Sequence, residues 1–301
     1  MIERGHDVHC LVRPAHRPWR LRDIAPAPAV HAVDLLDIPA LDALLGTLEP
    51  HWVLHLAAYG AYESQADAAR CVRTNVEGTV QLLDAAARHG VERLVNTGSS
   101  SEYGRKDHAP DETEALEPNS LYAVTKAAAT AYARHAGRSG KLHTTTLRLY
   151  SVYGPYEEPT RLIPTLIVRG LSGRYPPLVS PDTARDFVYV DDVLSAYEAA
   201  LLAPIPSGGV YNVGSGVQIS LRTAADVCRS AFDIAEEPRW DSMPPRGWDT
   251  ATWVANTART RSELGWQATT SFEEGFARTV GWLAASPERR SFYENARTLP
   301  T

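Results

Sequence analysis

Tyr122 and Lys126 are the residues whose types and spacing point most directly to chemistry. They stand four positions apart in an Ala-rich stretch that predicts a helix over Leu121–Arg138, so their side chains share one helix face. An ammonium beside a phenol favours the phenolate and lowers the phenol pKa from about 10 toward neutrality. Such a phenolate removes the proton of a substrate hydroxyl while a hydride leaves the carbon that bears it. The pair therefore predicts acid–base chemistry at an alcohol or ketone.

A run of serines stands at the end of a predicted strand that precedes this helix. The strand is expected over Arg93–Thr97, and the residues that follow it are Gly98-Ser99-Ser100-Ser101-Glu102-Tyr103-Gly104. Ligands of parallel α/β folds bind at the carboxyl ends of the strands. A serine hydroxyl at that edge is suited to hold the oxygen from which Tyr122 takes a proton. The alternative for Tyr122 and Lys126 is an exposed pair on a surface helix.

The elements that must position these residues follow from the hydrophobic pattern. Short β-branched runs alternate with Ala-rich stretches, which is typical of a parallel α/β sheet. Strands are expected at 8–13, 29–33, 51–57, 93–97, 142–149, 187–190 and 210–213, with helices at 70–89, 121–138 and 191–202. The proline-rich stretch 150–185 predicts an irregular excursion. We therefore expect a sheet domain in residues 1–154 and 186–214, and a smaller mixed α/β domain in 155–185 and 215–301.

Composition excludes several classes of protein. The chain has 301 residues, 44% of them hydrophobic, which suffices for two domains. The net charge of −6 argues against a protein that binds the phosphate backbone of nucleic acids. No apolar run is long enough for a membrane span, and Met1–His6 lacks the apolar segment of a signal peptide, so a cytoplasmic location is predicted. Three distant cysteines and ten histidines without ligand spacing predict no disulfide framework and no metal site.

Further motifs follow the predicted elements in order. They comprise residues 55–58, 74–79, 98–104, 122–126, 147–155, 185–193, 211–216 and 262–266. With these motifs the chain resembles the extended short-chain dehydrogenase/reductases, within them the nucleotide-sugar branch of the NAD-dependent epimerase/dehydratase family. The resemblance spans nearly the whole chain and implies a Rossmann-type doubly wound parallel sheet with a smaller substrate domain. It also implies a nicotinamide cofactor and a nucleotide-diphosphate sugar as substrate.

The resemblance assigns roles to the catalytic motifs. It implies that Tyr122 is the acid–base residue and that Lys126 lowers the pKa of Tyr122 and binds the nicotinamide ribose. Ser99, counted back from Gly104, matches the catalytic serine or threonine of the family. Ser100 is the alternative for that position.

The same resemblance places a second set of residues beside the substrate. Ser100 and Ser101 are expected near the sugar. Arg185 and Arg246 match arginines that reach the substrate diphosphate, a task suited to a planar guanidinium. A surface salt bridge is the alternative for each arginine.

A third set is expected to contact the cofactor. Besides Tyr122 and Lys126, it comprises Arg13, Asp34, Leu35, Leu56, Ala57, Ala58, Asn75, Tyr150 and Val152. Asp34 matches a position that touches the adenine, with a helix N-cap as the alternative. For Asn75 the resemblance favours a supporting role over chemistry. Arg13 slightly favours NADP over NAD because it suits a 2′-phosphate, and a solvated loop arginine is the alternative.

One departure from the family concerns the reaction. In the dehydratases of this branch an Asp-Glu pair follows the catalytic threonine and eliminates water. Here Ser100 and Ser101 follow Ser99, and the first carboxylate is Glu102. Without an acid and a base at those positions, epimerisation or ketone reduction is favoured over 4,6-dehydration.

A second departure concerns the cofactor site. A dinucleotide fold needs a first strand and a glycine-rich turn whose amides hold the pyrophosphate. The spacing places both upstream of Met1, and the only Gly-x-Gly, Gly214-Ser215-Gly216, follows the last predicted strand. We therefore expect unpaired strand edges between residues 8–12 and 51–57, and a native protein longer by roughly 20 N-terminal residues. The alternative is a shortened protein that binds dinucleotides poorly.

These observations predict an NAD(P)-dependent nucleotide-sugar epimerase or 4-ketoreductase. A non-catalytic nucleotide-sugar-binding protein, a 4,6-dehydratase and a reductase of other ketones are the alternatives. By analogy with the family, the helices at 70–89 and 121–138 are expected to form the face of a homodimer.

Overall fold

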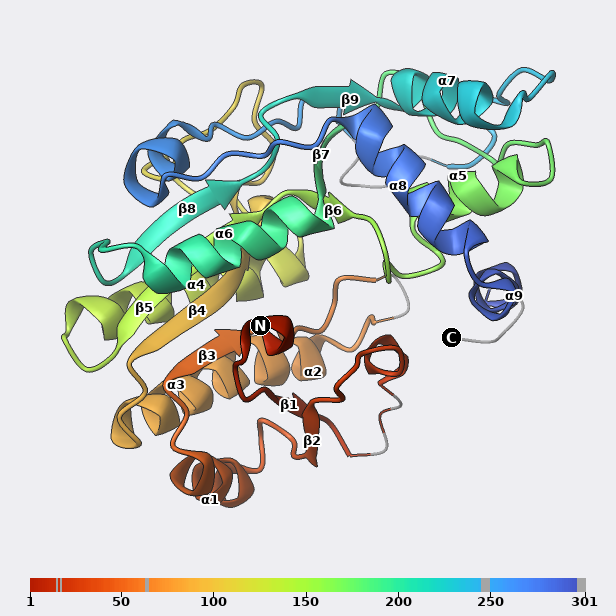
Figure 1. Ribbon diagram of the computed structural model, residues 1–301. Helices are drawn as coiled ribbons and strands as arrows, with labels where there is room; N and C mark the ends of the chain where they lie inside the picture. The colour runs from red at the N-terminus through yellow and green to blue at the C-terminus, as the bar shows by residue number, and fades with distance from the viewer. Residues whose placement is uncertain (15, 17, 63–64, 245–249, 297–301) are drawn as a thin grey trace.

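The protein is described by a computed structural model of residues 1–301, except for residues 15, 17, 63–64, 245–249 and 297–301. Its strands (Figure 1) are β1 (His9–Val12), β2 (Ala29–Ala32), β3 (Trp52–His55), β4 (Arg93–Ser99), β5 (His143–Leu149), β6 (Ser151–Tyr153), β7 (Ala184–Tyr189), β8 (Gly209–Val213) and β9 (Gln218–Ser220). Its α-helices are α1 (Ile38–Leu48), α2 (Ala68–Val72), α3 (Gly78–Arg88), α4 (Leu121–Arg138), α5 (Leu162–Gly170), α6 (Val190–Leu202), α7 (Leu221–Phe232), α8 (Phe272–Ala284) and α9 (Pro287–Asn295). Shorter helical segments are η1 (Ile2–Arg4), η2 (Trp19–Leu21), η3 (Arg73–Glu77), η4 (Ser100–Tyr103) and η5 (Thr260–Leu264).

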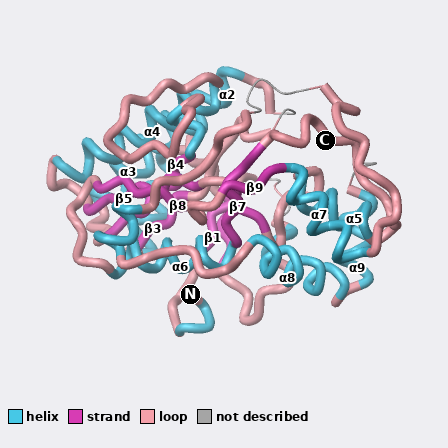
Figure 2. The backbone as a smooth tube through the Cα atoms, turned by 90° about the horizontal axis from the view of Figure 1, so that it is seen from above, coloured by secondary structure: helices cyan, strands magenta, loops and turns pink. Residues whose placement is uncertain are grey.

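The described strands form three sheets. β1 pairs with β2, a parallel sheet has the order β3-β4-β5-β8, and β6, β7 and β9 form a third sheet in which β9 is antiparallel. Helices α3 and α4 cover one face of the four-stranded sheet and α6 covers the other. Figure 2 shows the strands as a layer between these helices. The arrangement confirms the predicted Rossmann-type doubly wound sheet.

The N-terminal strand pair stands apart from the larger sheet. Among the described residues, β1 forms no hydrogen-bonded ladder with β3, which confirms the prediction of unpaired strand edges between them. Nearby, Arg4 forms an ion pair with Glu198 of α6. The rings of His6 and Trp52 lie 5.2 Å apart, so η1 and its neighbours pack beside β3 (Figure 1).

Helix α4 has the bounds that its sequence predicts and positions the predicted catalytic pair. The Ser120 side chain caps its N-terminus by accepting a hydrogen bond from the Ala123 N–H at 3.1 Å. Small side chains at Ala123, Ala129 and Ala133 are buried against the sheet. Because they are small, the helix lies close to β4 and β5 and brings its first turns to the carboxyl ends of those strands.

Two predicted segments differ from the structure. The helix expected over 70–89 is divided into α2, the π-helical η3 and α3, and π-helical turns are frequent at functional sites. The prediction of an irregular excursion over 150–185 is wrong, because this stretch holds β6 and α5. Pro164 stands in the first turn of α5, where a missing N–H costs no helical hydrogen bond. The neighbouring Ile163 and Leu166 are fully buried.

The part of the chain around α5 has its own hydrophobic core. This core joins α5, α7, α8 and α9 to β7 and includes Leu166, Phe187 and Phe276. Two further cores lie on the two faces of the four-stranded sheet. Within the described ranges, no helix is both long and apolar enough to cross a membrane.

Candidate active site

Ser99, Tyr122 and Lys126 come together at the carboxyl end of β4. The Ser99 side chain lies beside the Tyr122 hydroxyl, where it acts to lower the pKa of Tyr122. Lys126 lies one turn further along α4 and is buried, with 2% of its surface exposed. Its ammonium makes no hydrogen bond and no ion pair with the residues that the structure describes. Tyr122 and Lys126 thus stand one turn apart on α4, with Ser99 at the adjacent strand end.

The turn after β4 fixes the position of Ser99. Ser99 is the N-cap of η4, where its Oγ accepts a hydrogen bond from the Ser101 N–H at 3.2 Å. The Glu102 carboxylate accepts in return from the Ser99 N–H at 2.9 Å, which completes a capping box. The Oγ atoms of Ser99 and Ser101 lie 2.8 Å apart. Ser99 and Ser101 therefore lie together at this edge.

Burial governs the pKa values of the two titratable groups. It raises the pKa of Tyr122 to about 12, against the opposing effects of the Ser99 hydrogen bond and the Arg161 charge. Burial lowers the pKa of Lys126 to about 8. The Tyr–Lys spacing predicts a lowered pKa for Tyr122, and that prediction is wrong because desolvation of the buried phenol outweighs the groups that lower its pKa.

A buried polar chain lies beneath these residues. Arg148 of β5 donates from Nε to Glu102 Oε2 and from Nη1 to the Tyr103 hydroxyl, each at 2.9 Å. The Tyr103 hydroxyl donates to Asn212 Oδ1 of β8 at 2.8 Å. Thr130 of α4 donates to Glu102 Oε1 at 2.9 Å. Sequence analysis singled out only Glu102 in this chain, although an arginine inside the apolar run of β5 is itself a sign of a buried partner.

Asn75 lies in η3 and is hydrogen-bonded both to the loop after β3 and to α4. Its side chain accepts from the Tyr59 N–H at 2.8 Å and donates to the Tyr59 carbonyl at 2.7 Å. It also donates to Thr125 Oγ1 at 2.9 Å. Asn75 therefore ties the loop after β3 to the helix that carries Tyr122 and Lys126.

The other residues predicted to touch the cofactor lie at the carboxyl ends of their strands. Leu56, Ala57 and Ala58 form an exposed apolar loop after β3, with Leu56 61% exposed. Arg13 is exposed after β1. Asp34, which precedes Leu35 after β2, accepts from the Leu36 N–H at 3.0 Å, and the N-cap of α1 is Asp37 instead.

Tyr150 and Val152 lie beyond β5. Val152 is in β6 and packs against the core on the α6 face. Tyr150 is buried, and its hydroxyl has no hydrogen-bond partner among the described residues. Burial raises the pKa of Tyr150.

The backbone amides of the single Gly-x-Gly sequence are bound by a carboxylate of the protein itself. Asp186 of β7 accepts hydrogen bonds from the Ser215 N–H at 2.7 Å and from the Gly216 N–H at 2.9 Å. It also accepts from the Ala255 N–H at 2.9 Å. The amides after β8 are thus satisfied by Asp186 and do not offer a phosphate cradle.

The expected substrate residues are linked by a tryptophan that sequence analysis missed. Trp253 donates from its indole nitrogen to Ser100 Oγ at 3.2 Å. The Arg185 guanidinium carbon lies 5.5 Å from the centre of the Trp253 ring. Arg246 lies outside the described residues. No sequence signal marks Trp253, because it follows the last predicted element.

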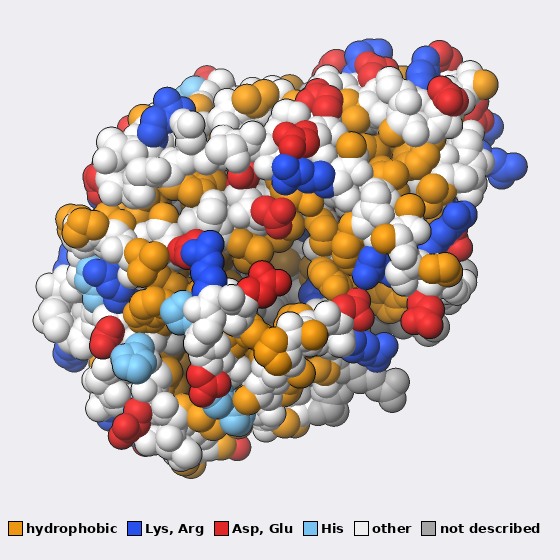
Figure 3. Space-filling model, in the orientation of Figure 1, with side chains coloured by type: hydrophobic (Ala, Val, Ile, Leu, Met, Phe, Trp, Pro, Cys, Tyr) orange, Lys and Arg blue, Asp and Glu red, His pale blue; other side chains and the backbone are white. Residues whose placement is uncertain are grey.

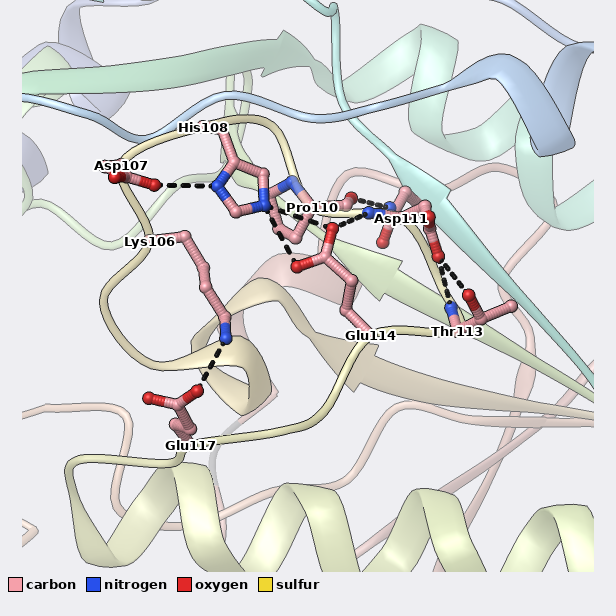
Figure 4. Close-up of polar contacts among 9 residues, drawn as sticks. Lys106, Asp107, His108, Pro110, Asp111, Thr113, Glu114 and Glu117 are labelled. Atoms are coloured by element: carbon pink, nitrogen blue, oxygen red, sulfur yellow. Dashed lines mark hydrogen bonds and ion pairs between the residues drawn. The ribbon is translucent and has the colours of Figure 1, made fainter.

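A loop after η4 lines a pocket beside Ser100. The pocket is bordered by Ser100, Tyr103, Gly104, Lys106, His108, Pro110, Tyr150, Thr252, Trp253 and Val254. Figure 4 shows how the loop is held: Lys106 donates to Glu117 at 2.9 Å, and the His108 ring bridges Asp107 at 2.8 Å and Glu114 at 3.0 Å. Hydrogen bonds to these two carboxylates raise the pKa of His108.

The surface has mixed charge. On the face in Figure 3, Lys and Arg side chains are interspersed with Asp and Glu. Hydrophobic side chains gather in a hollow between the part that carries the N-terminal strands and the rest of the molecule. Among the described residues, no group of three or more His, Cys, Asp or Glu side chains has the arrangement of a metal site.

Comparison with known proteins identifies relatives over most of the chain. The NAD dependent epimerase/dehydratase family matches residues 1–214. A dTDP-glucose 4,6-dehydratase of Streptomyces antibioticus is 31% identical over 289 residues, which is 93% of this chain and 83% of the relative. A UDP-glucose 4-epimerase of Mycolicibacterium smegmatis is 32% identical over 254 residues, covering 82% of this chain and 80% of the relative.

A solved structure extends the similarity to the fold. The UDP-glucose 4-epimerase of Thermus thermophilus, in complex with NAD, superposes with a TM-score of 0.84 and 28% identity over 95% of this chain and 93% of that protein. The doubly wound sheet, with Ser99, Tyr122 and Lys126 near its carboxyl edge, defines the class as α/β proteins with a Rossmann-type fold. The chain belongs to the NAD-dependent epimerase/dehydratase family.

Proposed function

We propose that the protein is an NAD(P)-dependent enzyme that oxidises and reduces C4 of a nucleotide-activated sugar, as an epimerase or as a 4-ketoreductase. The placement of the Ser99 side chain beside Tyr122, with the buried Lys126 one turn away on the same helix, carries this proposal. The relatives named above are nucleotide-sugar epimerases and dehydratases, which supports this substrate class over other ketones.

Each of the three residues has one task in the proposed reaction. Tyr122 takes the proton from the sugar hydroxyl and returns it when the ketone is reduced. Ser99 Oγ holds the same oxygen. Lys126 supplies the positive charge that favours the phenolate once substrate is bound. In an epimerase the keto sugar rotates in the site between the oxidation and the reduction, whereas in a reductase only the reduction occurs.

The residues at the catalytic end fit a nicotinamide dinucleotide. The Lys126 ammonium without a described partner suits ribose hydroxyls, and the exposed loop at Leu56–Ala58 offers an apolar surface beside it. When bound, the dinucleotide supplies the hydride acceptor and donor. We propose that Asp34, Leu35, Asn75, Tyr150 and Val152 border the same site. No Gly-x-Gly turn of the described residues is free to hold the pyrophosphate.

The choice between NAD and NADP rests on one residue. The related Thermus thermophilus enzyme is described with NAD, whereas Arg13 stands exposed after β1 and suits a 2′-phosphate. Dissociation constants of both dinucleotides, measured for the wild type and Arg13→Ala, decide this point. Tighter binding of NADP than of NAD, with the difference lost in Arg13→Ala, identifies an NADP enzyme. Tighter binding of NAD than of NADP in the wild type identifies an NAD enzyme.

We propose that two parts of the chain bind different ligands. Residues 1–154 and 186–214 hold the dinucleotide, and residues 155–185 and 215–301 hold the nucleotide sugar, with Ser100, Ser101 and Arg185 facing it. Arg246, from the segment that precedes Trp253, is proposed to join Arg185 at the diphosphate. A homodimer through residues 70–89 and helix α4 is supported by exposed apolar side chains in these segments: Val72, Leu121 and Val124 are each at least 40% exposed.

A 4,6-dehydratase is the second candidate, because dehydratases are among the relatives. Elimination of water needs an acid and a base beside the sugar. Glu102, the first carboxylate after Ser99, is 0% exposed and paired with Arg148. Its burial supports the epimerase or reductase over the dehydratase.

Product analysis with a panel of nucleotide sugars tests the proposal. Purified protein is incubated with NAD or NADP and UDP- or dTDP-sugars, and the products are separated and identified by mass and NMR. An epimer of equal mass supports an epimerase, and a 4-keto sugar reduced by NADPH supports a reductase. A 4-keto-6-deoxy product identifies a dehydratase, and binding of sugar nucleotide without any turnover identifies a non-catalytic binding protein.

A further inference from the structure

Glu102 is a buried carboxylate whose surroundings serve the active site. It is 0% exposed, and its partner Arg148 is 1% exposed. Three groups donate to its two oxygens, each at 2.9 Å: the Ser99 N–H, the Thr130 hydroxyl and the Arg148 Nε. The Arg148 charge and the three donated hydrogen bonds favour the ionised form of this carboxylate and act against burial, which raises the pKa of Glu102.

Burying this ion pair costs free energy, so its position in the core calls for a reason other than stability. Taking a carboxylate and a guanidinium out of water is expensive, and apolar residues of the same volume often stabilise a fold as well or better. Stability alone therefore does not explain the pair. The backbone is shaped around it, because a Cβ at Gly98 would lie 2.9 Å from Glu102 Oε1.

Glu102 joins the two elements that carry the catalytic groups. Through the Ser99 N–H it holds the turn that places the Ser99 hydroxyl. Through Thr130 it holds α4 one turn beyond Lys126. The carboxylate thus fixes the end of β4 relative to the helix face of Tyr122 and Lys126.

Glu102 also supplies negative charge near the Lys126 ammonium. The titratable groups that act on or are influenced by Lys126 are Glu102 from η4, Cys71 from α2 and His55 from β3, and Tyr122 stands one turn before it on α4 itself. Burial lowers the pKa of His55 to about 3, so it is neutral near pH 7. The charge of Glu102 raises the pKa of Lys126 against desolvation, and the same carboxylate is paired with the Arg148 guanidinium.

We propose that Glu102 is a positioning residue of the reaction: its buried carboxylate fixes Ser99 and keeps the Lys126 ammonium protonated, with Arg148 setting how much of its charge reaches Lys126. The consequence for the reaction rests on the proposed function of Ser99, Tyr122 and Lys126. The effect of Glu102 on the protonation of Lys126 does not depend on that proposed function.

Lysine NMR measures that proton directly. The chain has three lysines, Lys106, Lys126 and Lys141, so lysine labelled with ¹³C at Cε gives a spectrum that single Lys→Arg variants assign. The midpoint of the Lys126 titration is compared between wild type, Glu102→Gln and Arg148→Met. We expect it to fall by about one pH unit in Glu102→Gln and to rise in Arg148→Met.

Opposite shifts of the Lys126 midpoint in the two variants distinguish a charge effect from a loosened structure. Either substitution breaks the same pair and destabilises the fold, whereas only a direct charge effect moves Lys126 in two directions. Asp192→Asn is the matched control: Asp192 is also a buried carboxylate that accepts from a hydroxyl and a backbone N–H, on the opposite face of the sheet. It is expected to leave the Lys126 midpoint unchanged.

The outcomes are distinct. An unchanged midpoint in both variants, or a shift in the same direction in both, overturns the proposal. If Glu102→Gln does not fold, a rise in Arg148→Met and a return toward the wild-type midpoint in the double variant Glu102→Met/Arg148→Met support it, and no rise overturns it. Once a substrate is known, the alkaline limb of kcat/KM in Glu102→Gln is expected to move to lower pH along with the Lys126 midpoint.

Discussion

The two faces of the four-stranded sheet bury different kinds of side chain. The face toward α6 is mainly apolar, with Val95, Leu147, Tyr211 and Val213 packed against that helix. The face toward α3 and α4 begins apolar at the amino ends, with Leu94 among its core residues. Toward the carboxyl ends it becomes polar, with His55, Asn96, Thr146, Arg148 and Asn212 all buried.

This difference separates stability from function within one sheet. The strands alternate, so neighbouring residues of β5 serve opposite faces: Leu147 joins the α6 core, while Arg148 holds Glu102 below the catalytic residues. Burying apolar surface stabilises the fold. The polar side chains at the carboxyl ends of the α4 face hydrogen-bond to one another, and they fix the position of Ser99 relative to α4. We therefore expect substitutions on the α6 face to change stability, and substitutions on the α4 face to change turnover.

Tyr122→Phe is expected to have the largest effect on turnover. Removing the hydroxyl that moves the proton lowers kcat by about 10,000-fold, which corresponds to about 5 kcal/mol of transition-state stabilisation. Binding of nucleotide sugar, measured by calorimetry, stays within a few-fold of wild type. Tyr132→Phe, on the same helix but bonded to Asp84, is the control and keeps its activity. Normal turnover in Tyr122→Phe would remove Tyr122 from the mechanism.

Leu147→Ala is expected to give the largest loss of stability on the apolar face. Leu147 is 0% exposed, and emptying its site costs about 4 kcal/mol through lost burial and a cavity. Urea unfolding measures the loss, and the activity per folded molecule stays near that of the wild type. A fall in kcat as large as the one in Tyr122→Phe would contradict the division between the two faces.

Lys126→Met is expected to stabilise the protein while it abolishes turnover. The pKa of Lys126 is lowered from 10.5 to about 8 by burial, so below pH 8 the buried charge costs the folded state about 3 kcal/mol. Between pH 8 and 10.5 the folded protein loses this proton while the unfolded chain keeps it, so the contribution of Lys126 to stability rises with pH. The advantage of Lys126→Met is therefore largest near pH 7 and vanishes above the unfolded pKa. Urea unfolding at pH 7 and pH 10 tests this, and an advantage that is equal at both would refute it.

Thr145→Val and Thr146→Val form the finest test, because these neighbours on β5 are each 1% exposed and face opposite helices. The Thr145 hydroxyl has no partner among the described residues, so removing it stabilises the fold by about 1 kcal/mol. Thr146 accepts from Asn96 Nδ2 at 3.2 Å, and its loss destabilises by about 1 kcal/mol. Thermal unfolding of both variants measures the difference, and equal signs would contradict the assignment of faces.

Much of the fold follows from local sequence. Helix α4 has the predicted bounds, and the strands β1 to β5, β7 and β8 lie where β-branched runs predict them. The prediction fails over 150–185, where prolines obscure β6 and α5. Pro164 stands in the first helical turn, a position that proline tolerates, so its presence did not exclude a helix.

The candidate site was predictable in part. Ser99, Tyr122 and Lys126 stand in motifs whose spacing is local, and the structure brings them together. Trp253 was not predictable, since its contact with Ser100 joins segments that are distant in the chain. The pKa of Tyr122 was predicted with the wrong sign, because burial is a property of the folded molecule and not of residue spacing.

The sequence by itself determined which residues share a helix face and which stand at the end of a strand, because both depend on backbone periods of a few residues. It placed Tyr122 beside Lys126 and the serines after β4 for that reason. Only the tertiary structure decided that Glu102 pairs with Arg148 and that Asp186 occupies the amides of the Gly-x-Gly turn. These contacts join distant segments in a dry interior, where an unpaired charge is too costly to persist and each buried group must find a partner.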